Sequence, residues 1–183
     1  MTEPDRGLTP HNLDPIGDCR VLRDVHAQPG IKTVEGTMMP LLSGEKIRSH
    51  MIVMHAGQYC EAHPHETESI IYTISGRWVF CTVEDGKEVR TVIGPNDLFH
   101  FPGGVPTGFE TPFGEDASIL IVKSGSESYE EMVDGISWAR DHMAKDAARG
   151  VPFYYDDLPS DHPARVYGRE VSGRDPGLSG GSA

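Results

Sequence analysis

The stretch "GQYCEAHPHETESIIYTISG", residues 57–76, decides the fold of this chain. Its second half is rich in isoleucine, tyrosine and threonine, which favour β-strands, and His63 and His65 stand one residue apart just before it. Alternate residues of a strand point to the same face of a sheet. The spacing therefore directs both imidazoles into one small volume, where they either bind one metal ion or form hydrogen bonds inside a polar barrel mouth.

Residues that favour β-strands are also frequent on both sides of this stretch. Short runs of Val, Ile, Thr, Tyr and Phe alternate with Gly, Pro and Asn turns roughly every eight to twelve residues, a spacing typical of sandwiches and barrels. Asp85-Gly86 suits a tight hairpin, because both central positions of such a turn take positive φ angles. We therefore expect an all-β, antiparallel domain over residues 31–123. Its predicted strands are 31–39, 46–56, 68–76, 77–85, 87–94, 97–102, 107–112 and 117–124.

The two ends of the chain differ from this β domain. Residues 1–30 contain four prolines and no sustained period, which predicts an extended arm with one short strand at residues 19–25. Residues 124–171 begin with apolar residues at helical spacing behind a capping box of Ser128 and Glu131, which predicts an amphipathic helix. The prolines and aromatic residues that follow predict an irregular segment docked on the barrel. Residues 172–183 are rich in glycine and serine and predict a disordered tail.

Composition limits the classes of function. The chain of 183 residues has 28 acidic and 16 basic side chains and a net charge of -12, which argues against a nucleic-acid partner, because phosphate binding needs clustered Lys and Arg. No apolar run approaches the roughly 18 residues of a membrane helix. The N-terminus lacks the pattern of a secretory signal, so we expect a cytoplasmic protein without a membrane partner. Three cysteines without CxxC spacing predict reduced thiols.

Glycines sharpen the pattern around the two histidines. One glycine lies six residues before His63, another lies eleven residues after His65, and "FPGGVPTGFETP" follows at residues 101–112. This arrangement resembles the motifs G-x5-H-x-H-x(3,4)-E-x6-G and G-x5-P-x-G-x2-H-x3-N of the cupin superfamily, over about residues 50–122. The resemblance implies a small antiparallel double-stranded β-helix, or jelly-roll barrel, here followed by the amphipathic helix. It also implies a homodimer and, as in many members, a divalent transition metal in the pocket.

Two of the family's usual ligand positions differ in this chain. The resemblance places the family's third histidine on Thr107 and its glutamate on Ser69, and neither is a good nitrogen or carboxylate ligand. Two imidazoles alone seldom hold a divalent ion, so a third ligand is needed. Glu68 would serve if a bulge shifted the strand alternation. His100 lies on the strand that leads into the second motif, and Glu66 is close in sequence.

The leading hypothesis for function is a metal-dependent enzyme that acts on a small organic molecule, with an oxygenase of the dioxygenase type as the first choice. Fe is the preferred metal, with Mn, Ni, Cu or Zn as alternatives. The predicted roles are metal binding for His63, His65, Glu68 and His100, and a catalytic or substrate-orienting role for Glu68, Tyr72 and Thr107. Two alternatives stay open: a non-catalytic cupin that binds a small molecule, and a metal-independent isomerase or lyase with His63 or His100 as general base.

Overall fold

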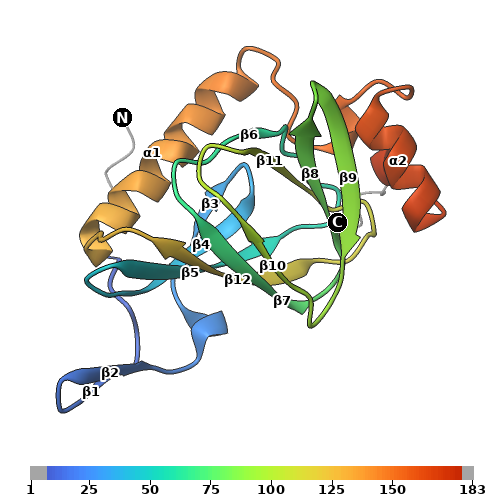
Figure 1. Cartoon of the computed structure of the whole chain (residues 1–183). Helices are drawn as coiled ribbons and strands as arrows, with labels where there is room; N and C mark the ends of the chain where they lie inside the picture. Colours follow the sequence, from blue (N-terminus) through green and yellow to red (C-terminus); the bar gives the residue numbers. More distant parts are fainter. Residues whose placement is uncertain (1–7, 179–183) are drawn as a thin grey trace.

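Two antiparallel β-sheets face each other in the body of the protein (Figure 1). The computed structural model describes residues 8–178. One sheet has the strand order β10-β7-β12-β5-β4-β3 and the other the order β6-β11-β8-β9. This arrangement confirms the predicted all-β fold with a helix after the barrel. The strands are β3 Ile31–Thr33, β4 Gly36–Ser43, β5 Ile47–Met54, β6 His63–Pro64, β7 Ser69–Ser75, β8 Trp78–Glu84, β9 Lys87–Ile93, β10 Leu98–Phe101, β11 Pro106–Glu110 and β12 Ala117–Ser124.

The core lies between the sheets because each strand turns alternate side chains inward. Trp78 of β8 is fully buried and stacks on Phe109 of β11, with 5.3 Å between the ring centroids. Its Nε1 donates a hydrogen bond of 3.0 Å to Oγ1 of Thr73 in β7. A large apolar side chain buried in this way contributes about 1.5–3 kcal/mol to stability. Aromatic rings thus fill one part of the barrel interior and join the two sheets.

Two local signals in the sequence are confirmed. Asp85 and Gly86 join β8 to β9 with φ angles of 49° and 73°, as a tight hairpin requires. Before the helix α1 (Tyr129–Ala147), the backbone N–H of Glu131 donates to Oγ of Ser128 at 3.2 Å, and the N–H of Ser128 donates to the Glu131 carboxylate at 2.7 Å. Both features depend only on neighbouring residues.

One predicted strand is two strands. The chain turns between β3 and β4, so residues 31–39 are not continuous. Gly36 follows the turn with a φ angle of 130°, and a Cβ atom there would lie 2.3 Å from the carbonyl oxygen of Val53 in β5. Only glycine allows β5 to approach so closely. The turn residue Glu35 is consequently held in the interior, with 8% of its surface exposed.

Helix α1 covers one side of the barrel (Figure 1). Its residues Val133 and Ile136 are buried against Ile31 of β3 and the partly buried Met38 of β4. Met38 also contacts the barrel core. Met38 therefore packs both against α1 and against the barrel core.

The two end segments have more regular structure than the sequence patterns indicate. The predicted arm contains a separate hairpin that projects from the barrel (Figure 1), formed by β1 Leu13–Ile16 and β2 Cys19–Leu22, and then η1 Val25–Ala27. The segment predicted to be irregular contains η2 Tyr155–Asp157 and α2 Pro163–Ser172, and η3 Pro176–Leu178 follows. Helix α2 is short and begins with Pro163, and prolines in a sequence usually indicate a loop. The sequence pattern therefore does not predict this helix. Residues 179–183 lie outside the described residues, and their disorder stays a prediction.

The C-terminal segment docks on the barrel through Tyr155. This residue is fully buried next to Tyr59, and its hydroxyl donates a hydrogen bond of 2.9 Å to Oε2 of Glu110 in β11. Arg90 of β9 donates from Nε to Oε1 of the same carboxylate at 2.9 Å. Burial raises the pKa of Glu110, and the Arg90 charge opposes that shift. A buried ion pair therefore anchors the segment.

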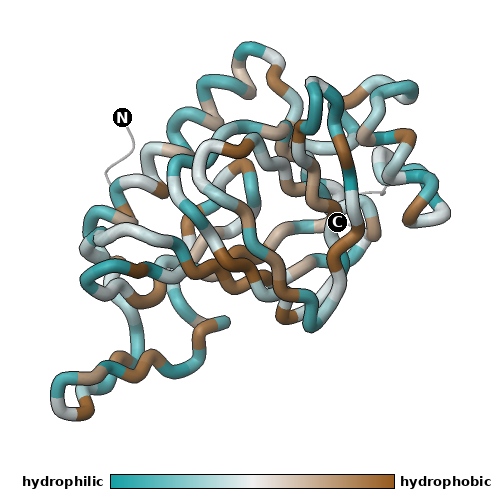
Figure 2. The backbone as a smooth tube through the Cα atoms, in the orientation of Figure 1, coloured by the Kyte–Doolittle hydropathy of each residue, from teal (hydrophilic) through white to brown (hydrophobic). Residues whose placement is uncertain are grey.

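Hydropathy follows this arrangement. Figure 2 shows the hydrophobic stretches gathered along the strands of the barrel, whereas both long helices have hydrophilic residues along much of their length. Within residues 8–178, no helix combines the length and the apolar character needed to span a membrane.

Candidate functional site

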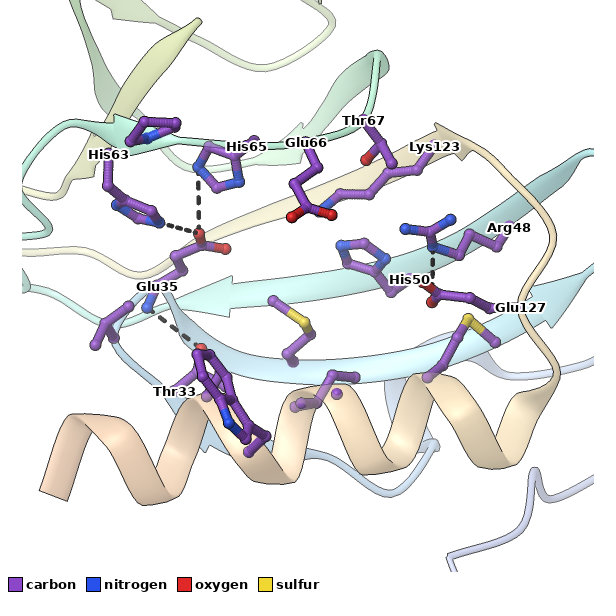
Figure 3. A pocket seen from close by; sticks show the side chains of 18 residues that line it. Thr33, Glu35, Arg48, His50, His63, His65, Glu66, Thr67, Lys123 and Glu127 are labelled. Atoms are coloured by element: carbon purple, nitrogen blue, oxygen red, sulfur yellow. Dashed lines mark hydrogen bonds and ion pairs between the residues drawn. The ribbon is translucent and has the colours of Figure 1, made fainter. Parts of the chain in front are cut away.

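Glu35, His63 and His65 converge on one point of the barrel wall (Figure 3). Oε1 of Glu35 lies 3.6 Å from Nε2 of His63 and 3.7 Å from Nε2 of His65. The imidazole rings lie side by side, with 4.5 Å between their centroids. One potential ligand atom from each of these three side chains lies within 4.8 Å of the other two. Among residues 8–178, no other group of three His, Cys, Asp or Glu side chains meets this criterion.

Local structure sets the position of each of these side chains. Glu35 occupies the β3–β4 turn, where its N–H donates to Oγ1 of Thr33 at 3.3 Å. His63 lies in β6, and its Nδ1 is 2.9 Å from the carbonyl oxygen of Glu61. A carbonyl can only accept, so Nδ1 carries the proton and Nε2 presents its lone pair towards Glu35. A fixed tautomer of this kind is typical of metal-binding histidines.

His65 is the most enclosed of the two imidazoles. Its side chain is 10% exposed and lies against the rings of Phe101 and Phe109, at 5.8 and 5.9 Å between centroids. Its Nε2 is buried without a hydrogen-bond partner. Burial lowers the pKa of His65, although the Glu35 charge acts in the opposite direction. The neutral form favoured by burial is the form that binds metals.

These atoms fit a divalent transition metal. The separations of 3.6 and 3.7 Å are too long for hydrogen bonds. Two ligand atoms that each lie about 2.1 Å from one ion are at most about 4.2 Å apart, so there is room for an ion between them. A cation would also pair the buried nitrogen of His65 and neutralise the buried Glu35 carboxylate, both of which are costly to leave unpaired.

The structure places Glu68 and His100, which the sequence predicts as further ligands, outside the group formed by the two histidines and Glu35. These two side chains pair with each other, with 2.8 Å between His100 Nε2 and Glu68 Oε1, and both are more than half exposed. Ser69 is buried at the start of β7, so its neighbour Glu68 points outward, and no bulge at this point reverses the alternation. The structure therefore does not bring either side chain to the His63 and His65 pair.

The structure also separates the two residues predicted to orient a substrate. Tyr72 lies on the outer face of β7, and its hydroxyl donates a hydrogen bond of 2.9 Å to Oδ1 of Asn96. It does not line the cavity described below, and its substrate-orienting role stays a prediction. Thr107 is fully buried and lies directly opposite His63 in the pairing of β11 with β6. Its Oγ1 has no hydrogen-bond partner. Thr107 thus stays next to the site, but it supplies no charge.

Two residues of the site were not predicted from the sequence, Glu35 and His50. The signal for Glu35 was the glycine that follows it, because an isolated glycine in a strand pattern indicates a turn or a close backbone approach. His50 lies in β5, is 5% exposed, and has an unpartnered Nε2. Its ring shares the inward face of β5 with Ile52 of the core. The strand sequence "IRSHMIVM" predicts that His50 and Ile52 share one face of the strand, but it does not predict which face points into the barrel.

The metal-ligand group opens onto a cavity of about 390 Å³. The cavity lies between the inward face of the barrel and α1 (Figure 3). Polar side chains of the strands form one wall, and apolar side chains of α1 such as Met132 and Ile136 form the other. Glu66 lines the rim as an exposed residue. The site therefore combines a small polar cluster with space for an organic molecule.

A protein-family profile described as a cupin domain matches residues 50–123. Glu35 lies outside these matched residues, whereas His63 and His65 lie inside them. No curated protein matches the chain in sequence.

Several solved structures are similar to this chain. A mutant of oxalate decarboxylase from Bacillus subtilis is 18% identical, with a TM-score of 0.51, and the match covers 60% of this chain and 30% of that chain. An RmlC-like cupin from Shewanella frigidimarina is 18% identical, with a TM-score of 0.43, covering 50% of this chain and 78% of that chain. A cupin domain from Bordetella pertussis is 13% identical, with a TM-score of 0.43, covering 53% and 100%. At these identities the likeness concerns the fold alone.

Proposed function

We propose that this chain, whose residues 50–123 match a cupin domain, is a metal-dependent enzyme that oxidises or cleaves a small organic molecule with O2. The observation that carries this proposal is the convergence of Glu35, His63 and His65 on the wall of a cavity. Two imidazole nitrogens and one carboxylate oxygen, with the remaining positions open, are the donor set of non-haem iron oxygenases. Fe is accordingly the preferred metal, with Mn, Ni, Cu or Zn as alternatives.

The chain's own residues have distinct roles in this proposal. Glu35 supplies the negative charge of the ligand set, and the Glu61 carbonyl keeps the His63 tautomer in the binding form. The aromatic rings behind His65 keep water away from that side of the site. The bound metal would supply Lewis acidity towards a substrate oxygen atom and, if redox-active, electrons for O2 chemistry. Because the cavity lies on the other side of the three ligands, we expect the substrate to react on that side.

Two further expectations accompany this function as proposals. The protein acts in the cytoplasm, and it works as a homodimer, as the resemblance of its motifs implies. Light scattering of the purified protein measures the second of these, and a monomer at micromolar concentration would contradict it.

Metal content tests the proposed function. Wild type is loaded anaerobically with Fe(II), desalted and measured by inductively coupled plasma mass spectrometry, and about one ion per chain is expected to remain. Glu35→Gln and His65→Ala each remove one ligand atom and are expected to lower metal affinity by at least about tenfold. The matched controls Glu68→Gln and His100→Ala change the same residue types on the outer face and are expected to keep wild-type metal content.

Two outcomes separate the parts of the proposal. Equal metal content in wild type and His65→Ala would contradict the proposed metal centre, and the absence of retained metal in both would favour a metal-free binding protein. Oxygen uptake by the iron-loaded protein, measured against a set of small organic acids, tests the oxygenase. Turnover that continues at the same rate without O2 would contradict oxygen-dependent chemistry while leaving the metal site intact.

A further inference from the structure

A second polar cluster lines the same cavity. Arg48 and His50 lie two residues apart on β5, and Lys123 lies on β12 directly opposite Arg48. Residues directly opposite each other in antiparallel strands have their side chains on the same face. All three basic side chains therefore point into the cavity, as Figure 3 shows, at some distance from the Glu35 group.

The inward faces of β5 and β12 change character towards this end. Along β5 the inward side chains run from Ile52 of the core to His50 and then Arg48. Along β12 they run from Ile121 of the core to Lys123. The register of the two strands brings both basic ends together. Like charges directly opposite each other destabilise a sheet unless a counter-charge is present.

The counter-charges available in the chain balance only one of the two cations. Arg48 pairs with Glu127 at 3.0 Å and donates a hydrogen bond of 2.8 Å to the carbonyl of Ser124. The main chain of Lys123 belongs to β12, but its side chain forms no hydrogen bond or ion pair with the residues that the structure describes. Burial lowers the pKa of Lys123, and the Glu35 charge is the largest influence that opposes this shift. Glu66 lines the cavity too, but it is exposed and forms no ion pair with Lys123 within residues 8–178.

His50 adds a second observation that points to a ligand. Its side chain is 5% exposed, lines the cavity, and leaves Nε2 without a partner. Burial, with the nearby Lys123 and Arg48 charges, lowers the pKa of His50 well below its usual value. A neutral imidazole can donate one hydrogen bond to an anion that the two cations attract.

We propose that Arg48, His50 and Lys123 bind the carboxylate group of the substrate, which is a small organic acid with an apolar body. This inference rests on the proposed function in one respect. A metal bound to Glu35 would neutralise the negative charge that partly balances Lys123, and the carboxylate of the substrate would then supply the negative charge next to Lys123. Met132 and Ile136 of α1 form the apolar wall for the remainder of the molecule. A cavity of about 390 Å³ limits that remainder to a small group.

Binding of a homologous series of acids tests the proposal. The straight-chain carboxylates from acetate to octanoate, each compared with its amide, are titrated into wild type by calorimetry, with and without Zn²⁺. At least one carboxylate is expected to bind, more tightly with Zn²⁺ than without it, and its uncharged amide is expected to bind at least about tenfold more weakly. If no acid of the series binds in either condition, or if the amides bind equally well, the proposal is overturned.

Variants test whether Arg48, His50 and Lys123, here called the basic cluster, cause the preference for acids over amides. Lys123→Met keeps the length of the side chain but removes its charge, and it is expected to weaken carboxylate binding by about tenfold or more. Lys123→Arg is expected to restore part of the affinity, and the exposed Lys87→Met serves as the control with wild-type affinity. Unchanged binding in Lys123→Met overturns the proposal. Circular dichroism verifies that the variant is folded, and if it is not, Lys123→Arg and Arg48→Lys carry the same comparison against the amides.

The two proposals fail separately. Metal content in Glu35→Gln tests the metal centre alone, whereas the difference between acid and amide in the metal-free protein tests the basic cluster alone. Carboxylate binding without any metal binding would overturn the proposed function and leave the basic cluster as an anion site. Metal binding without discrimination between acid and amide would leave the metal centre and overturn the carboxylate site.

Discussion

Nε2 of His65 lies 3.7 Å from Oε1 of Glu35, a separation too long for a hydrogen bond and short enough for a shared cation. Glu35 comes from the turn between β3 and β4, whereas His65 follows β6 in a different sheet. The contact therefore depends on how the two sheets close on each other. It brings a carboxylate to the histidine pair, which gives the three donor side chains of the proposed metal centre.

Zinc is expected to stabilise wild type against thermal unfolding through this contact. A ligand at a free concentration 100-fold above its Kd adds about 2.7 kcal/mol to the free energy of unfolding. Glu35→Gln removes the anionic ligand, so the rise in Tm at the same Zn²⁺ concentration should fall by at least half. Differential scanning calorimetry measures both values. Glu68→Gln is the control, and a rise in Glu35→Gln as large as in wild type would contradict the ligand assignment.

Gly36→Ala is expected to disturb the site through the backbone. The added Cβ would lie 2.3 Å from the Val53 carbonyl oxygen, so the β3–β4 turn must move, and Glu35 with it. We expect a loss of about 2 kcal/mol or more in unfolding free energy, together with weaker metal binding. Gly86→Ala is the comparison, because Gly86 has a φ angle of 73° but open space around it. It should cost about 1 kcal/mol and leave metal binding unchanged.

Arg90→Met is expected to destabilise the protein strongly. It leaves the carboxylate of Glu110, 1% exposed, without its cationic partner in the interior. Removing one partner of a buried ion pair costs about 3–5 kcal/mol. Urea unfolding measures this loss. Arg149→Met breaks an exposed pair with Asp146 and should change stability by less than about 1 kcal/mol; equal losses in both variants would contradict the anchoring role of the buried pair.

Stability is expected to fall as the pH drops below about 6.5, the usual pKa of histidine in an unfolded chain. Burial lowers the pKa of His50 in the folded state, so the unfolded chain takes up the proton first and becomes favoured as pH falls. His50→Gln should therefore lose less stability than wild type between pH 7.5 and 5.5, measured by urea unfolding at each pH. The exposed His100→Gln serves as control. Identical pH dependence in wild type and His50→Gln would rule out this contribution.

Glu68 and His100 point away from the histidine pair for a definite physical reason. The choice of Glu68 required a bulge near the start of β7, but the regular alternation of this strand buries Ser69 and turns Glu68 to the outside. The choice of His100 required an inward side chain on β10, and its pairing with Glu68 shows the outer face. Local patterns give the alternation of a strand, and the packing of the core decides which face is inside.

The sequence by itself determined the features that depend on neighbouring residues. These are the β-strands, the Asp85-Gly86 turn, the cap of α1 and the placement of His63 and His65 on one face, because strand period, turn chemistry and capping act over a few residues. Only the tertiary structure decided that Glu35 lies next to His63 and His65 and that Lys123 lies opposite Arg48. Both contacts join distant parts of the chain, and they depend on how the strands pack around the shared core, which no local pattern specifies.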